Sequence, residues 1–201
     1  NYLTDSYVFD KYVDTPATGD TILRYTKHDG TEQGNALYQL EMQPNHTITV
    51  TSGVVSFAKD DSAIRRTTHF KYDLTTKFLS DSYVFNGYKE AMVTGDKLIR
   101  YIKHNNTEEG LAEYQLEMKT GGQAITVNAN SGAVSFTKDD TTVKRTTRFT
   151  YNGLNYLTDS YVFDKYVDTP ATGDTILRYT KHDGTEQGNA LYQLEMQPNH
   201  T

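Results

Sequence analysis

The sequence NYLTDSYVFDKYVDTPATGDTILRYTKHDGTEQGNALYQLEMQPNHT occupies residues 1–47 and returns without a change at residues 155–201. A diverged third copy, FLSDSYVFNGYKEAMVTGDKLIRYIKHNNTEEGLAEYQLEM, begins at Phe78. An internal repeat of this kind indicates that one structural unit is used several times along the chain. Alignment of the copies predicts one unit at residues 2–77, a second at 78–155, and a partial copy of the first at 156–201.

Within each unit the apolar residues recur with a period of two. Tyr38, Leu40 and Met42 alternate with polar residues, and so do Ile48 and Val50. Alternation of this kind is typical of strands that bury one face. We therefore expect six or seven strands per unit, and in the first unit they fall near residues 6–13, 21–28, 35–43, 47–52, 54–58 and 63–73.

Turn chemistry separates these strands. Asp29-Gly30, matched by Asn105-Asn106 in the second unit, predicts a two-residue hairpin, and Ser52-Gly53 predicts another turn. The extra residues of the second unit fall in 119–123 and 128–131, and such length differences indicate surface loops. Residues 31–37 are the best helix candidate, but a glycine in their middle favours a loop.

These patterns predict an all-β protein made of tandem, small antiparallel β-sandwich or barrel-like units of about 77 residues. A unit of that size is marginally stable alone, so we expect it to gain stability from its neighbours. A lipocalin-like barrel that both complete units close together, around an apolar ligand, is a weaker alternative.

The partial copy at 156–201 contains no counterpart of the strands that follow residue 47. We therefore expect it to expose Tyr192, Leu194 and Met196, an arrangement that is unfavourable in water. Either a longer array or a partner chain would complete such a half unit. A third possibility places the true domain boundary near Ile48 and Gly122, so that the half unit comes first.

Composition and charge exclude several classes of function. The net charge of −6, with basic residues diluted by neighbouring aspartates, argues against a nucleic-acid partner. No apolar run is long enough for a membrane-spanning helix. The absence of cysteine excludes a disulfide framework and cysteine-ligated metal.

No chemistry-bearing motif is present. His28, His104 and His182 occupy matching positions, and we interpret them as solvent-exposed because no metal-ligand spacing such as HExxH accompanies them. The pairs Asp60-Asp61 and Asp139-Asp140 are interpreted as turn residues rather than calcium ligands. Since phosphate-binding loops and nucleophile elbows are also absent, we expect no catalytic residue, metal or cofactor, and no enzymatic activity.

Tyrosines and asparagines supply the remaining candidate sites. Eight tyrosines recur as a set and are candidates either for ligand stacking or for sheet packing, which we favour: Tyr7, Tyr12, Tyr25, Tyr38, Tyr83, Tyr88, Tyr101 and Tyr114. Asn45, Asn105 and Asn199 each begin an Asn-x-Thr triplet on a predicted turn, which makes them possible N-glycosylation sites.

In general pattern the chain resembles the tandem β-domain stalks of surface adhesins and extracellular fibrils, because it is repetitive, acidic, rich in Thr and Tyr, and free of Cys. An array that repeats without closing forms a rod or filament. We expect a structural protein, extracellular or at the cell surface, whose partners are neighbouring repeats or identical chains. The alternative is a module that binds glycans or another partner through tyrosine-lined sheet faces.

Overall fold

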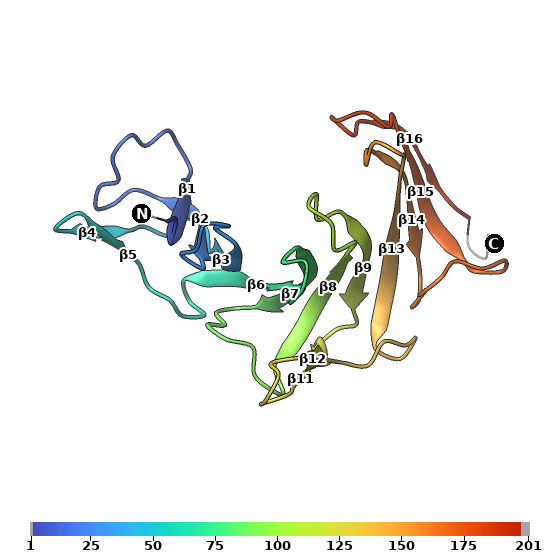
Figure 1. Ribbon diagram of the computed structural model, residues 1–201, viewed down its shortest axis with the longest axis horizontal. Helices are drawn as coiled ribbons and strands as arrows, with labels where there is room; N and C mark the ends of the chain where they lie inside the picture. Colours follow the sequence, from blue (N-terminus) through green and yellow to red (C-terminus); the bar gives the residue numbers. More distant parts are fainter. Residues whose placement is uncertain (1, 198–201) are drawn as a thin grey trace. The chain divides into compact units, whose positions relative to one another are not determined.

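A computed structural model describes residues 2–197 of the chain. These residues form an all-β structure of antiparallel strands, and no helix occurs among them (Figure 1). The chain divides into two compact units. Among the described residues, unit 1 comprises 2–70 and 84–92, and unit 2 comprises 71–83 and 93–197. Because these units are defined by contacts and not by sequence similarity, the repeat boundaries predicted above stay a prediction.

Unit 1 contains one set of long strands and a short hairpin. Its strands are β1 (Asp5–Phe9), β2 (Ile22–His28), β3 (Ala36–Met42), β4 (Thr49–Thr51), β5 (Val54–Ser56) and most of β6 (Ile64–Tyr72). The long strands follow the order β1-β2-β3-β6, and β4 pairs with β5 in a separate two-stranded sheet. The strand β7 (Leu79–Asn86) is divided between the two units.

Unit 2 repeats these strand types over a longer stretch of chain. Its strands are β8 (Lys97–His104), β9 (Ala112–Met118), β10 (Gln123–Ala124), β11 (Thr126–Val127), β12 (Val134–Ser135), β13 (Val143–Tyr151), β14 (Leu157–Phe163), β15 (Ile176–His182) and β16 (Ala190–Glu195). The long strands follow the order β8-β9-β13-β14-β15-β16, β10 pairs with β8, and β11 pairs with β12. In Figure 1, β13, β14 and β15 lie side by side.

The core of unit 1 explains the two-residue period of the sequence. Tyr38, Leu40 and Met42 point to one face of β3 and are buried there with Ile22 and Ile64 of the neighbouring strands. The hairpin β4–β5 and the segment after it cover this face, because Val50, Val55 and Phe57 pack against the same cluster. Two layers therefore enclose the apolar side chains, which gives the unit its sandwich character.

The predicted strands agree with the observed ones in place and number. The expected strands at 21–28, 35–43 and 63–73 correspond to β2, β3 and β6. The strand expected at 6–13 is shorter, because the ladder between β1 and β2 shifts register at Val8 and Phe9 and pairing stops there.

Two connections test the turn predictions. Ser52 and Gly53 both have positive φ angles, 52° and 79°, which is the geometry of a tight two-residue hairpin. The two-residue hairpin expected at Asp29-Gly30 is wrong. The loop spans residues 29–35, because the Asp29 N–H donates to the Asn35 carbonyl and the Asp29 carboxylate caps Thr31.

The barrel-like form of the unit and the lipocalin-like barrel are also wrong. A closed barrel requires the first and last strands of the sheet to pair. Among residues 2–197, β1 pairs only with β2 and β16 pairs only with β15, so both ladders stay open. The same part of the chain contains no helix with the length and apolar character needed to cross a bilayer.

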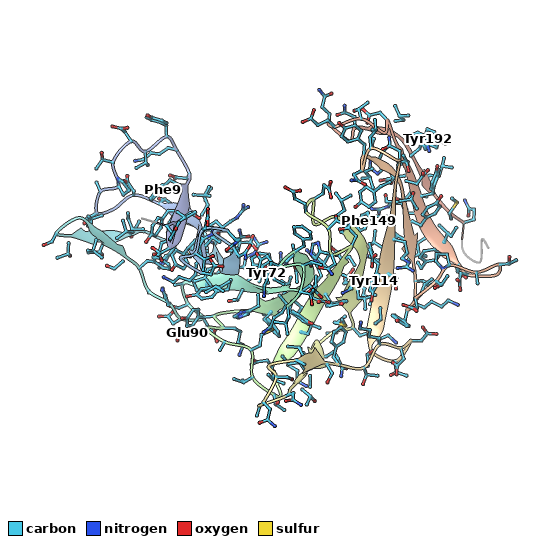
Figure 2. The ribbon with its side chains drawn as sticks, viewed as in Figure 1. Phe9, Tyr72, Glu90, Tyr114, Phe149 and Tyr192 are labelled. Carbon is cyan, nitrogen blue, oxygen red and sulfur yellow. The ribbon has the colours of Figure 1, made fainter. Side chains whose placement is uncertain are left out.

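The outer strand β16 differs sharply from its sequence counterpart β9. Tyr114 and Leu116 of β9 are 8% and 0% exposed, whereas Tyr192 and Leu194 of β16 are 51% and 47% exposed. Figure 2 shows Tyr114 and Tyr192 in these two settings. The exposure expected for Tyr192 and Leu194 is therefore confirmed, whereas Met196 is half-buried. Neighbouring strands, not the local sequence, decide whether this face is buried.

This contrast predicts unequal costs for the same substitution at two places in unit 2. We expect Leu116→Ala to lower the free energy of unfolding by about 2–5 kcal/mol, because it leaves a cavity in a closed core. Leu194→Ala should lower it by less than about 1 kcal/mol, because the side chain is already half in water. Urea unfolding followed by tyrosine fluorescence measures both. Equal losses for the two variants would contradict the observed burial.

Candidate functional site

The eight recurring tyrosines divide into buried and exposed members. The structure buries five of them, Tyr25, Tyr38, Tyr83, Tyr101 and Tyr114. Tyr7 and Tyr88 are half-buried, and Tyr12 is 89% exposed. The buried rings pack on each other, with the centroids of Tyr101 and Tyr114 6.0 Å apart. Most of this set therefore serves sheet packing, and only Tyr12 presents a free ring.

A polar group accompanies the buried ring of Tyr101. Its hydroxyl donates to Asp81 Oδ1 at 2.5 Å, and Lys103 Nζ lies 3.4 Å from the same oxygen. Burial alone would raise the pKa of Asp81, but hydrogen bonds from Ser80 and Tyr101 and the charge of Lys103 hold that pKa below its ordinary value. Asp81 therefore stays ionised and anchors the tyrosine.

The same arrangement occurs in the other two copies of this sequence. Tyr25 donates to Asp5 and Tyr179 donates to Asp159, each at 2.6 Å. Burial of Asp159 acts to raise its pKa, but hydrogen bonds from Tyr179 and Lys181 outweigh burial and lower the pKa to about 2. A carboxylate with so low a pKa is a poor proton acceptor, so this cluster is suited to structure and not to acid–base catalysis.

A serine and a histidine lie on the same pair of strands. His104 Nδ1 is 2.7 Å from the Gly110 carbonyl, so that nitrogen carries the proton and Nε2 accepts from Ser82 Oγ at 2.9 Å. This is the spacing of a nucleophile and its base. Ser82, however, is only 2% exposed, so a substrate could not reach its oxygen. The pair holds the loop 105–111 to β7.

The interpretation of the histidines as exposed is wrong. His104 and His69 are buried, and His28 and His182 are half-buried with the same serine and glycine partners as His104. These partners lie 22 residues away in the sequence or across a loop, so no local pattern identifies them. Among residues 2–197, no group of three or more His, Asp or Glu side chains is placed to hold a metal ion.

A groove of about 690 Å³ in unit 2 lies beside this cluster. Its wall includes Tyr83, Tyr101 and Asp81, together with Lys138. The Lys138 ammonium stands 4.5 Å from the centre of the Tyr101 ring, and burial lowers its pKa. The groove therefore combines aromatic edges with both signs of charge.

The paired aspartates serve as turn caps. Asp60 Oδ1 accepts from the N–H groups of Ser62 and Ala63. Asp61 reaches further and accepts from the Tyr88 N–H at 2.7 Å. Asp140, at the matching position, accepts from the Tyr166 N–H at 3.0 Å. The first aspartate of each pair closes its own turn, and the second holds the loop after the following long strand.

A buried threonine holds the same loop. Thr67 Oγ1 donates to the Gly87 carbonyl at 2.8 Å and accepts from the Lys89 N–H at 3.0 Å. Thr146 does the same with the Lys165 carbonyl at 2.7 Å and the Val167 N–H at 3.0 Å. We call this pair of contacts, with the aspartate above, the threonine clamp. Sequence analysis missed both threonines, because nothing distinguishes them from the many exposed ones.

A second recurring contact docks the hairpin onto the long strands. The Gly19 N–H donates to the Ile48 carbonyl, and the Ile48 N–H donates to the Asp20 carbonyl, both at 3.0 Å. Thr18 Oγ1 accepts from the Val50 N–H at 2.8 Å. We call residues 48–72, which contain β4, β5 and β6, the donor segment. The surface that it covers, made by the loop 17–20 and β3, is the acceptor surface.

The second copy forms the same docking contacts. Gly95 donates to the Ile125 carbonyl at 2.9 Å, Ile125 donates to the Asp96 carbonyl at 3.1 Å, and Thr94 Oγ1 accepts from the Val127 N–H at 2.9 Å. The geometry is that of strand addition, in which backbone groups supply affinity and alternate side chains fill the face beneath. This donor–acceptor contact and the threonine clamp are the arrangements best suited to joining segments of polypeptide.

The possible glycosylation sites lie on loops where they are described. Asn45 is exposed on a turn with a φ angle of 62°. Asn105 is half-buried, and its side-chain oxygen accepts from Thr107 and Leu111, which leaves its side-chain nitrogen as the group a glycan would need. Asn199 lies outside the described residues.

Comparison with known proteins adds no relative. No protein-family model matches the chain, and no curated protein matches it.

The buried His104 predicts a pH dependence of stability. Burial lowers the His104 pKa below its ordinary value, and the bond to Gly110 opposes this only in part. His104 therefore binds a proton more readily in the unfolded chain than in the folded one. Its contribution to the unfolding free energy is complete above the unfolded pKa of about 6.5. That contribution is lost as the pH falls through the lower pKa of the folded state. We expect the unfolding free energy of unit 2 to be level above about pH 6.5 and to decline as the pH falls below that value.

His104→Gln tests the assignment, since it removes the titrating group but keeps a polar side chain. Urea unfolding at each pH should give a flatter profile for this variant than for the unchanged chain. His182→Gln, at the matching but less buried position, is the control and should change the profile less. An unchanged slope in His104→Gln would show that another group is responsible.

Proposed function

We propose that the chain is a structural tandem-repeat protein, extracellular or on a cell surface, that forms a filament, fibril or adhesin stalk. Its repeat units, at 2–77, 78–155 and from 156 onward, join end to end by β-strand packing or strand exchange. The proposal includes no catalytic residue, metal or cofactor. Its partners are neighbouring repeats or identical chains.

The observation that carries this proposal is the threonine clamp. It occurs twice, at Thr67 and at Thr146, and each time it holds the loop that follows the first long strand of the next sequence copy. A contact that links one copy to the next in the same way can be extended without a new fold, which is the physical basis of repeat arrays.

Localisation and glycosylation follow from the same proposal. A chain without cysteine needs neither oxidising nor reducing conditions to keep its fold. The exposed turn at Asn45 is a sterically open acceptor for a glycan. The turn at Asn45 supports an extracellular setting for the array, and the lack of cysteine fits that setting as well as any other.

Electron microscopy tests the assembly directly. We expect negatively stained preparations of the concentrated chain to contain fibres whose axial repeat equals one or two sequence units. Small-angle scattering should report particles that lengthen with concentration. A compact monomer at every concentration would contradict the proposal.

Removing the hydroxyl group of Thr146 tests whether the threonine clamp stabilises the protein. Thr146→Val keeps the shape of the side chain but leaves the Lys165 carbonyl and the Val167 N–H without their buried partner. We expect a loss of about 1–3 kcal/mol in unfolding free energy, the usual cost of an unsatisfied buried polar group. Thr147→Val, at the next position on β13, should cost little, and urea unfolding compares the two. Equal effects would mean that the clamp has no special role.

A second candidate function is a module that binds a glycan or another partner. The groove beside Tyr83, Tyr101 and Lys138 favours it, because aromatic edges and charged groups converge there. A glycan array with clear hits, lost in Lys138→Ala, would favour this function over the first. Tyr12, with its exposed ring, offers a further contact point.

A further inference from the structure

A third copy of the docking loop is already shaped for a donor segment. At Thr172–Gly173–Asp174 the Gly173 φ angle is 97°, against 96° for Gly19 and 98° for Gly95. The Asp174 carboxylate accepts from the Ala171 N–H at 2.9 Å, as Asp20 does from Ala17 at 2.8 Å. The loop therefore takes the docking conformation without Ile48 or Val50 in contact with it.

The strand beside this loop presents the matching apolar face. β16 has the same sequence as residues 36–41 of β3, which the donor segment covers in unit 1. Its side chains are half in water, as described above for Tyr192 and Leu194. Its outer edge also has no strand partner among residues 2–197. An exposed edge next to an apolar face is a template for strand addition.

The register that a donor would take can be read from the two filled copies. On β3, Leu40 lies opposite Thr67 and Met42 lies opposite Ile64. On β9, Leu116 lies opposite Thr146 and Met118 opposite Val143. Leu194 and Met196 correspond to Leu40 and Met42. The same register therefore places Thr67 of a donor opposite Leu194 and Ile64 of the donor opposite Met196.

Space for the donor's hairpin is present as well. A cavity of about 1060 Å³ in unit 2 is lined by the docking loop and by Tyr161, Phe163 and Ile176. The identical residues of unit 1, Tyr7, Phe9 and Ile22, belong to the cluster that Val50, Val55 and Phe57 cover. Those three donor side chains are apolar, and they match the apolar floor of the cavity.

Charge is complementary at the end of the strand. Glu41 of β3 pairs with two donor arginines, with Nη atoms of Arg65 and Arg66 3.1 and 3.7 Å from its carboxylate. Glu117 of β9 pairs in the same way with Lys144 and Arg145, at 3.0 and 3.8 Å. Glu195 of β16 pairs instead with Arg178 of its own hairpin, at 2.7 Å. An incoming donor would offer it two further cations.

We propose that β16 and the loop at Thr172–Asp174 form an acceptor site for the donor segment, residues 48–72, of a second copy of this chain. The second copy is the occupant because its donor fits an identical acceptor in its own unit 1. Transfer from residues 1–47 of one chain to residues 155–197 of another exchanges one set of contacts for the same set, which is the low-cost route of domain swapping. The inference deepens the proposed function, on which its biological role rests, by naming a joining surface.

A synthetic peptide with the sequence of residues 48–72 tests the site itself. We expect it to bind the intact chain with one-to-one stoichiometry in fluorescence anisotropy. Hydrogen–deuterium exchange should slow at residues 190–195 and at Gly173, and a scrambled peptide should do neither. Absence of saturable binding, or protection only elsewhere, would overturn the proposal.

Charge reversal locates the bound peptide. Glu195→Arg should weaken binding about tenfold, because two ion pairs become two repulsions. A peptide carrying Arg65→Glu and Arg66→Glu should restore it. Glu186→Arg makes the same change of charge on the preceding turn and should leave the affinity unaltered. Equal effects of Glu195→Arg and Glu186→Arg would overturn the assignment to β16.

Sedimentation velocity tests the second copy as the source. The chain should self-associate with increasing concentration, and excess peptide should suppress this. A chain extended after Thr201 by the sequence of residues 48–77 should stay monomeric and lose peptide binding. Peptide binding by a chain that never self-associates would overturn the second copy as occupant. Absence of fibres with the site intact would count against the proposed filament alone.

Discussion

One buried hydroxyl in each of the two complete copies holds the loop that follows the next long strand. Thr67 and Thr146 are fully enclosed, so their hydroxyl groups must find partners inside the protein. Each finds a backbone carbonyl and a backbone N–H in the loop after the next long strand. Because both partners are fixed groups of the main chain, only one placement of that loop satisfies them.

The apolar faces obey a different constraint, which is that a strand buries its face only when a second layer is available. β9 and β16 carry almost the same sequence, yet one is core and the other is half in water. The difference lies in the second layer: Phe136, in the segment after β12, packs on the face that β8 and β9 share, whereas Tyr192 and Leu194 of β16 are half exposed. Whether the apolar face of a strand is buried thus depends both on that strand and on the segment that covers it.

Much of the fold could be predicted from the sequence, because one-sided strands leave a strong alternating pattern. Tyr38, Leu40 and Met42 identified β3 and its buried face, and Ser52-Gly53 identified a tight turn. The histidines could not be predicted, since the partners of His104 come from another strand and from a loop carbonyl. The clamp threonines were missed for the same reason. Contacts between residues about 20 positions apart leave no local signal.

The tip of the short hairpin is one of the places where the copies differ in length. β4 and β5 are joined by Ser52 and Gly53, whereas β11 and β12 are joined by the six residues 128–133, on otherwise equivalent strands. The tip therefore absorbs added residues without disturbing the layer beneath. It offers a natural insertion point for an epitope or a fluorophore, through which the position of each copy along an assembled particle becomes visible.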